Sequence, residues 1–163
     1  MSHLPEDEHT AEQMYIEDVG VVFEQAGFPR MAARVIGRLL ICEPPHQSPG
    51  ELAIALQASK ASISTSVRLL IQIGIVERVA FPGKRRDYYR IRDEAWSRMT
   101  EERMDLVTTI RELAERGIAL RAGTGHAADV RLREMREFYA FYEREMPAII
   151  ARWREEWQGK RHE

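Results

Sequence analysis

Apolar residues recur every three or four positions through most of the chain, and this periodicity predicts a mainly α-helical protein. The pattern becomes strand-like only over about 75–91. We expect helices at about 12–26, from 29 to before Pro44, from 49 to about 56, at 60–73, from 94 to about 120 and from 127 onward. Gly123 to Gly125 should separate the last two of these helices.

Two of the expected helices are short and lie on either side of a tight turn. Ser48-Pro49-Gly50-Glu51 has the spacing of a capping box, in which a serine side chain and a glutamate side chain each bond the other residue's amide. The helix should start at 49 and be short, because Ser59 offers a fresh N-cap only a few residues after it. This spacing predicts a helix-turn-helix with its turn near Gln57 and Ala58.

A β-hairpin should follow the second of these helices. Gly74 is suited to end that helix, and the strand-like stretches 75–81 and 87–91 are joined by Pro82-Gly83. The hairpin tip, 84–86, reads Lys-Arg-Arg and forms a basic wing. The predicted fold class is therefore mainly α, a winged helix-turn-helix with a two-stranded β-hairpin wing and long N- and C-terminal dimerisation helices.

The last helix carries more apolar surface than a small DNA-binding core needs. The first helix has Tyr15, Val19, Val22 and Ala26 at helical spacing. The last helix has an aromatic stripe from Met135 to Trp157, and Pro147 should kink or restart it. We therefore expect a homodimer, with a dimerisation helix at 1–28, a DNA-binding domain at 29–92 and a helical dimerisation region at 93–163.

Charge is distributed unevenly along the chain, although the net charge is only −2. Residues 1–28 carry −7, residues 29–92 carry +7 and residues 93–163 carry −2. A basic segment of this kind is typical of a surface that binds a polyanion. Ordinary solvated charge is the competing interpretation of this pattern.

The helix after Ser59 has the small polar and basic residues that a recognition helix needs in the major groove of double-stranded DNA. The wing cations should reach the neighbouring minor groove or the phosphates. The predicted DNA-binding residues are Ser48, Ser59, Lys60, Ala61, Ser62, Ser64, Thr65, Arg68, Arg78, Lys84, Arg85 and Arg86. The alternative is a winged-helix protein–protein interaction module without specific DNA binding.

Other functions lack the residues they would need. The start of the chain has no secretory signal pattern, and no apolar run reaches the ~20 residues of a membrane span, so we expect a cytoplasmic protein. Cys42 is the single cysteine, and core packing is favoured for it over redox sensing. The histidines have no metal-ligand spacing, and no nucleophile or phosphate-binding motif occurs. We predict no enzyme activity, no metal and no cofactor.

Several stretches together resemble a known family, the GbsR-like branch of the MarR superfamily of transcriptional regulators. They are 27–37, 48–56, 59–64, 74–78 and the wing Pro-Gly-Lys-Arg-Arg-Asp-Tyr-Tyr. The resemblance implies a dimeric repressor that a small-molecule effector releases from operator DNA. The wing departs from the usual MarR pattern of Asp-x-Arg followed by Leu-Thr, so effector properties are not transferred.

The effector-binding residues stay unassigned. The aromatic residues between 138 and 157 are suited to a quaternary ammonium ligand through cation–π attraction. Core packing or a dimer interface is the more usual role of an aromatic stripe at helical spacing.

Overall fold

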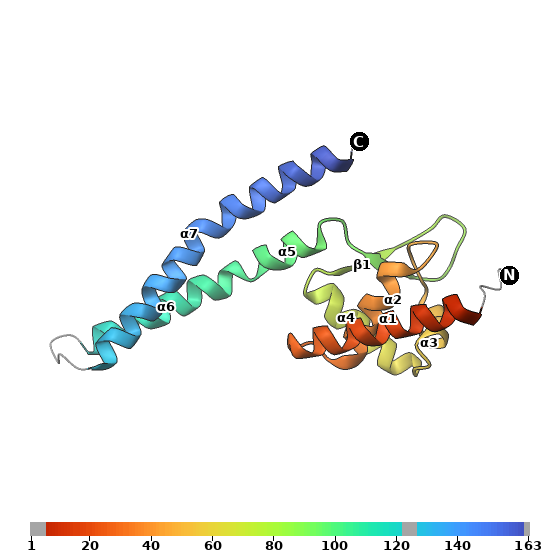
Figure 1. Cartoon of the computed structure of the whole chain (residues 1–163), viewed down its shortest axis with the longest axis horizontal. Helices are drawn as coiled ribbons and strands as arrows, with labels where there is room; N and C mark the ends of the chain where they lie inside the picture. The colour runs from red at the N-terminus through yellow and green to blue at the C-terminus, as the bar shows by residue number, and fades with distance from the viewer. Residues whose placement is uncertain (1–5, 122–126, 162–163) are drawn as a thin grey trace. The chain divides into compact units, whose positions relative to one another are not determined.

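Seven helices and one hairpin make up the described part, residues 6–121 and 127–161, of the computed structural model (Figure 1). They are α1 (Glu6–Gln25), α2 (Arg30–Ile41), α3 (Pro49–Ala55), α4 (Lys60–Gln72), β1 (Val76–Val79), β2 (Tyr88–Ile91), α5 (Ala95–Glu102), α6 (Met104–Leu120) and α7 (Ala127–Arg161). The predicted fold class is confirmed. The chain divides into two compact units, 1–95 and 96–163. The expected break at Gly123 to Gly125 lies outside the described residues.

Helix α1 packs along α2 through a face of small residues. A Cβ atom added to Gly37 of α2 would lie only 3.2 Å from the Cα atom of Ile16. Ile16 is fully buried, whereas Tyr15 and Val22, which belong to the apolar stripe read from the sequence, are 40% and 61% exposed. Val19 of the same stripe does lie against α2, 3.2 Å from a Cβ atom added to Gly37, so the apolar stripe coincides only in part with the packing face of α1.

The core of the first unit is built by α2, α3 and α4. Its buried side chains include Ala32, Val35, Ile36, Leu39, Leu52, Leu56, Ile63, Val67 and Leu70. Leu40 and Ile71 were also expected inside, but each is 40% exposed. Ile71 lies seven residues after Ser64 and three after Arg68, and this spacing places it on the exposed face of α4.

The wing is a two-stranded antiparallel hairpin with a third, very short partner. Its register runs from Val76 opposite Ile91 to Val79 opposite Tyr88. The backbone amide of Gln47 donates to the Tyr89 carbonyl at 2.9 Å, and the Tyr89 amide donates to the Gln47 carbonyl at 2.8 Å. The residue just before the cap of α3 is therefore paired with the wing, a contact that the sequence pattern did not predict.

The second unit is made of α5, α6 and α7, and α6 and α7 pack against each other. The single helix expected from 94 to 120 is interrupted at Arg103, where the amide bonds the carbonyl of Thr100 at 3.3 Å. The Thr100 hydroxyl donates to the Trp96 carbonyl at 3.0 Å, a local bond of the kind that bends helices. Helix α7 continues through Pro147 without restarting.

Helix α7 has 35 residues, but it contains many charged side chains. Neither α7 nor another helix in the described ranges is long and apolar enough to span a bilayer.

The close approach of α1 and α2 predicts the effect of enlarging Gly37. The Gly37→Val variant should lower the free energy of unfolding by about 1–3 kcal/mol, because the added atoms collide with the backbone of α1. Urea denaturation measures the change. Gly159→Val is the matched control, since nothing lies within 4 Å of a Cβ atom at Gly159 in α7. Equal stability of the two variants would contradict this packing.

Candidate nucleic-acid interface

Ser48 and Glu51 fix the start of α3. The Ser48 hydroxyl oxygen accepts from the Glu51 amide at 3.3 Å, and the Glu51 carboxylate accepts from the Ser48 amide at 2.7 Å. The bond from the Ser48 amide is the main reason that the pKa of Glu51 is lowered, and the charges of His46 and Lys84 act in the same direction. Ser48 is only 4% exposed. Its hydroxyl therefore serves the predicted capping box and is not freely presented to a ligand.

The turn and the second cap place α4 directly after α3. Gln57 adopts a positive φ of 49°, and the Ala58 amide bonds the Ala53 carbonyl at 2.9 Å. The Ser59 hydroxyl oxygen then accepts from the Ser62 amide at 3.1 Å. Both serines thus act at the N-terminus of α4, and the helix-turn-helix forms as its caps predicted.

Helix α4 buries its apolar side and exposes a polar face. The exposed residues of this face are Lys60, Ala61, Ser64, Thr65 and Arg68. Ser62 is half-buried at its edge, whereas Ser66 is buried. Arg68 lies along the helix, with its Nε donating to the Ser64 carbonyl at 3.4 Å. These residues form a continuous surface of hydroxyl, methyl and cationic groups.

The wing holds its three tip cations in different ways. The ammonium group of Lys84 lies 5.1 Å from the ring centre of Tyr88 and 5.8 Å from that of Phe81. Lys84 is therefore seated on the rings at the base of the wing, whereas no such ring contact holds Arg85 or Arg86 among the described residues; all three side chains are exposed. Arg78 on β1 is exposed as well, but it pairs with Asp87 at 3.6 Å.

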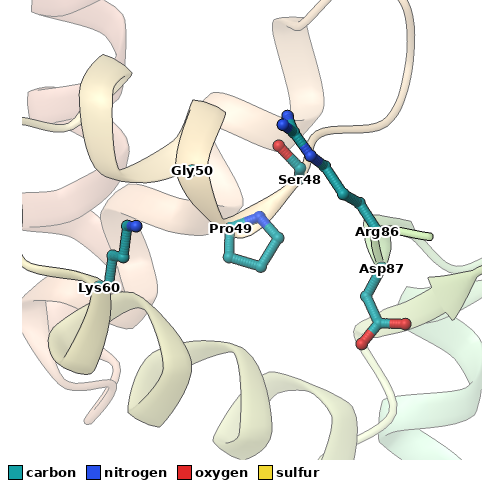
Figure 2. Close-up of a pocket in the computed structure, with 6 residues that line it drawn as sticks. All are labelled: Ser48, Pro49, Gly50, Lys60, Arg86 and Asp87. Carbon is teal, nitrogen blue, oxygen red and sulfur yellow. The ribbon is translucent and has the colours of Figure 1, made fainter. Parts of the chain in front are cut away.

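A groove of about 430 Å³ lies between the start of α3, the start of α4 and the wing. It is lined by Ser48, Pro49, Gly50, Lys60, Arg86 and Asp87. Figure 2 shows Lys60 and Arg86 on opposite sides of Pro49, the first residue of α3. The fold therefore brings one cation of the predicted recognition helix and one of the wing to the same groove.

Three arginines of α2 are already neutralised inside the first unit. The pairs are Arg30 with Glu17 and Glu24, Arg34 with Glu17, and Arg38 with Glu12, with N–O distances between 2.7 and 2.9 Å. The hydrogen bond from Arg30 is the largest cause of the lowered pKa of Glu17. The opposite charges of 1–28 and 29–92 thus partly cancel, and the +7 of the middle segment overstates the charge open to a partner.

The remaining cations of the middle segment are concentrated on one surface. Arg92 has an interaction of its own; the other cations of this segment that make no ion pair at 4.0 Å or less within 6–121 and 127–161 are Lys60, Arg68, Lys84, Arg85 and Arg86, and Lys84 also acts electrostatically on the Glu51 carboxylate. All five are exposed, and they belong to α4 and the wing tip. We call these five residues the free-cation surface.

Cys42 lies apart from this surface. It is 6% exposed at the end of α2, and burial raises the pKa of its thiol. Among the histidines, His46 packs its ring 4.5 Å from that of Phe81 and 5.2 Å from that of Tyr88 at the wing base. His9 is exposed on α1, while His3, His126 and His162 lie outside the described residues.

A helix-turn-helix with an exposed polar second helix and a basic hairpin beside it defines the class of winged-helix DNA-binding proteins. Residues 94–156 match the family model of MmpR5-like MarR family transcriptional regulators. The HTH-type transcriptional regulator MmpR5 of Mycobacterium tuberculosis is 38% identical over 139 residues, which span 85% of this chain and 84% of that protein. A crystal structure of a transcriptional regulator matches with a TM-score of 0.77 and 36% identity, covering 89% of this chain and 99% of the other.

The chain therefore belongs to the MarR family of winged-helix transcriptional regulators. Members of this family bind operator DNA and form dimers, and the family is one of regulators, not of enzymes. The protein is accordingly a DNA-binding regulator of transcription.

Burial of Cys42 predicts slow alkylation of the native protein. The thiolate is the reactive form, and both the raised pKa and the lack of access oppose its attack. Iodoacetamide at pH 8 should react at least about tenfold more slowly with the folded chain than with the chain in urea. Mass spectrometry of quenched samples gives the two rates, and equal rates would contradict a packing role.

Proposed function

We propose that this regulator is a homodimeric repressor that binds a pseudo-palindromic operator through α4 and the wing and is released by a small-molecule effector. The free-cation surface carries the proposal. In the same segment Arg30, Arg34 and Arg38 are held by carboxylates, so the exposed positive charge is left where a winged helix meets DNA. This distribution favours a polyanionic partner over uniformly solvated charge.

The proposed reading geometry follows from the exposed face of α4. The hydroxyls of Ser64 and Thr65 are suited to bases or phosphates, and the methyl group of Ala61 to a thymine methyl. Arg68 would reach guanine or the backbone. Lys60 and Arg86 would hold phosphates on the two sides of the groove, and Arg85 would enter the minor groove or follow its edge.

Apolar side chains left uncovered in each unit support the proposed dimer. On α1 these are Met14, Tyr15, Val21 and Val22, exposed by 40–63%. On α6 and α7 they are Leu106, Leu113, Leu120, Val130, Phe138, Phe141, Ile149, Trp153 and Trp157. A second copy would cover such surface and would set two recognition helices about 34 Å apart, one turn of DNA. Light scattering at micromolar concentration tests the dimer, and a monomer would contradict it.

Three finer assignments belong to the proposal. The GbsR-like branch rests on the sequence of 27–37 and of the wing. A cytoplasmic location is proposed because an operator-binding protein acts where the chromosome is. The effector is proposed as a small molecule without a named chemical class, and its binding residues stay unassigned.

Operator binding should depend steeply on salt. If each subunit neutralises about four phosphates, log K plotted against log salt has a slope of about −7 for the dimer. Fluorescence anisotropy with duplex from upstream of the protein's own gene, beside a scrambled duplex, gives both slope and preference. We expect the native duplex to be preferred about a hundredfold, or about 2.7 kcal/mol. Weak, equal binding to every genomic duplex tried would favour the protein-interaction module instead.

Substitutions on the free-cation surface should distinguish residues that contact DNA phosphates from residues that recognise DNA bases. Arg86→Ala should weaken binding to all duplexes alike and reduce the salt slope by about 2 per dimer, because one phosphate contact is lost per subunit. Arg68→Ala should instead reduce the preference for the operator, by about 1–3 kcal/mol. Lys160→Ala removes the same charge from an exposed site on α7 and should leave both quantities unchanged. Equal losses in all three variants would contradict the assignment.

A further inference from the structure

A chain of polar contacts joins α1 to the wing through Arg38. The Nε of Arg38 donates to Oε1 of Gln47 at 3.1 Å, and its Nη1 donates to Oε2 of Glu12 at 2.9 Å. Gln47 then exchanges its two backbone hydrogen bonds with Tyr89 of β2. The contacts therefore run from α1 through α2 and the segment before α3 to the second strand of the wing.

Burial limits the orientations that the side chains of Gln47 and Arg38 can adopt. Gln47 is 7% exposed and the side chain of Arg38 is 18% exposed. A polar group at such depth needs its partner, so the Gln47 amide is held in the orientation in which its oxygen meets Arg38. The two wing strands have only four residues each, and a hairpin of this size is marginal by itself. Its position therefore depends on the bonds and the buried apolar contacts that tie it to the helices.

Arg34 offers an internal comparison, one turn earlier on the same helix. Its side chain is also 18% exposed, and its Nε donates to Glu17 of α1 at 2.7 Å. Its Nη1 also contacts the sulfur atom of Met31 on α2. Arg34 and Arg38 thus each bind a glutamate of α1, through Nε and Nη1 respectively, but the contact with Gln47 belongs to Arg38.

We propose that Arg38 is a positioning residue for DNA binding: it orients Gln47, which fixes β2 and thereby the wing cations relative to α4. Arg38 itself does not lie on the free-cation surface, so it acts on DNA only through the wing. The effect on operator affinity rests on the function proposed above, whereas the effect on the wing itself does not.

Full-length Arg38→Met and Arg34→Met are compared by two measurements. Amide hydrogen exchange followed by NMR reports the wing directly, as the exchange rate of the Tyr89 amide divided by that of a core amide of α2 such as Ile36. Arg38→Met should raise this ratio about tenfold, while Arg34→Met leaves it unchanged. Operator affinity should fall about tenfold in Arg38→Met only, with a shallower salt slope. Equal effects of the two variants on both quantities would overturn the proposal.

A double-mutant cycle with Gln47→Leu tests whether Arg38 acts through Gln47. The Arg38→Met change should cause no further loss of affinity when Gln47→Leu is already present, whereas additive losses would contradict the route. Arg38→Lys keeps the charge opposite Glu12 but lacks the Nε–H that reaches Gln47, so it should raise the Tyr89 exchange ratio even if the methionine variant folds poorly. Failure of the wild type to bind any operator would refute the proposed function, and the exchange ratio would still decide the role of Arg38.

Discussion

The backbone pairing between Gln47 and Tyr89 is the contact on which the geometry of the interface depends. On one side of Gln47, Ser48 caps α3 and so sets the helix-turn-helix. On the other, His46 packs its ring against Phe81 and Tyr88 at the base of the wing. Three successive residues, His46 to Ser48, therefore hold both the helix-turn-helix and the wing. Because the wing has only two short strands, this segment determines how far Arg86 stands from α4, and the groove between Lys60 and Arg86 is its result.

Charge in the first unit is divided between stability and recognition. The carboxylates of α1 hold the arginines of α2, which ties these helices together and removes those cations from the surface. The cations of α4 and the wing tip are left exposed. In the proposed function, their attraction to phosphate would supply sequence-independent affinity, and the hydroxyls and Arg68 on α4 would supply contacts able to distinguish bases. In the proposed dimer, the outer face of α1 would contact the second copy. One side of this helix would then neutralise the arginines of α2, and the other side would form the dimer interface.

Local signals in the sequence were enough to predict the helix-turn-helix. The Ser48–Glu51 box and the Ser59 cap depend on residues three apart, and the buried face of α4 follows from its own periodicity. Contacts between distant segments could not be obtained in this way. The sequence did not show that Ile16 would pack against Gly37. Nor did it show the ion pair between Arg38 and Glu12 or the backbone pairing of Gln47 with Tyr89. Summing charge by segment singled out 29–92, but it also counted arginines that the fold neutralises. The break at Arg103 depends on a local Thr100 bond that competes weakly with the helix and leaves no clear sequence signal.

The central claim is that α4 and the wing together form the surface that meets DNA. Hydrogen exchange of the backbone amides, compared with and without the operator duplex, tests it most directly. The account predicts that DNA binding protects residues 59–68 and 82–87 together. The outer face of α1, which would lie in the dimer interface, should change less. Protection confined to α6 and α7, with α4 and the wing unchanged by DNA, would contradict it.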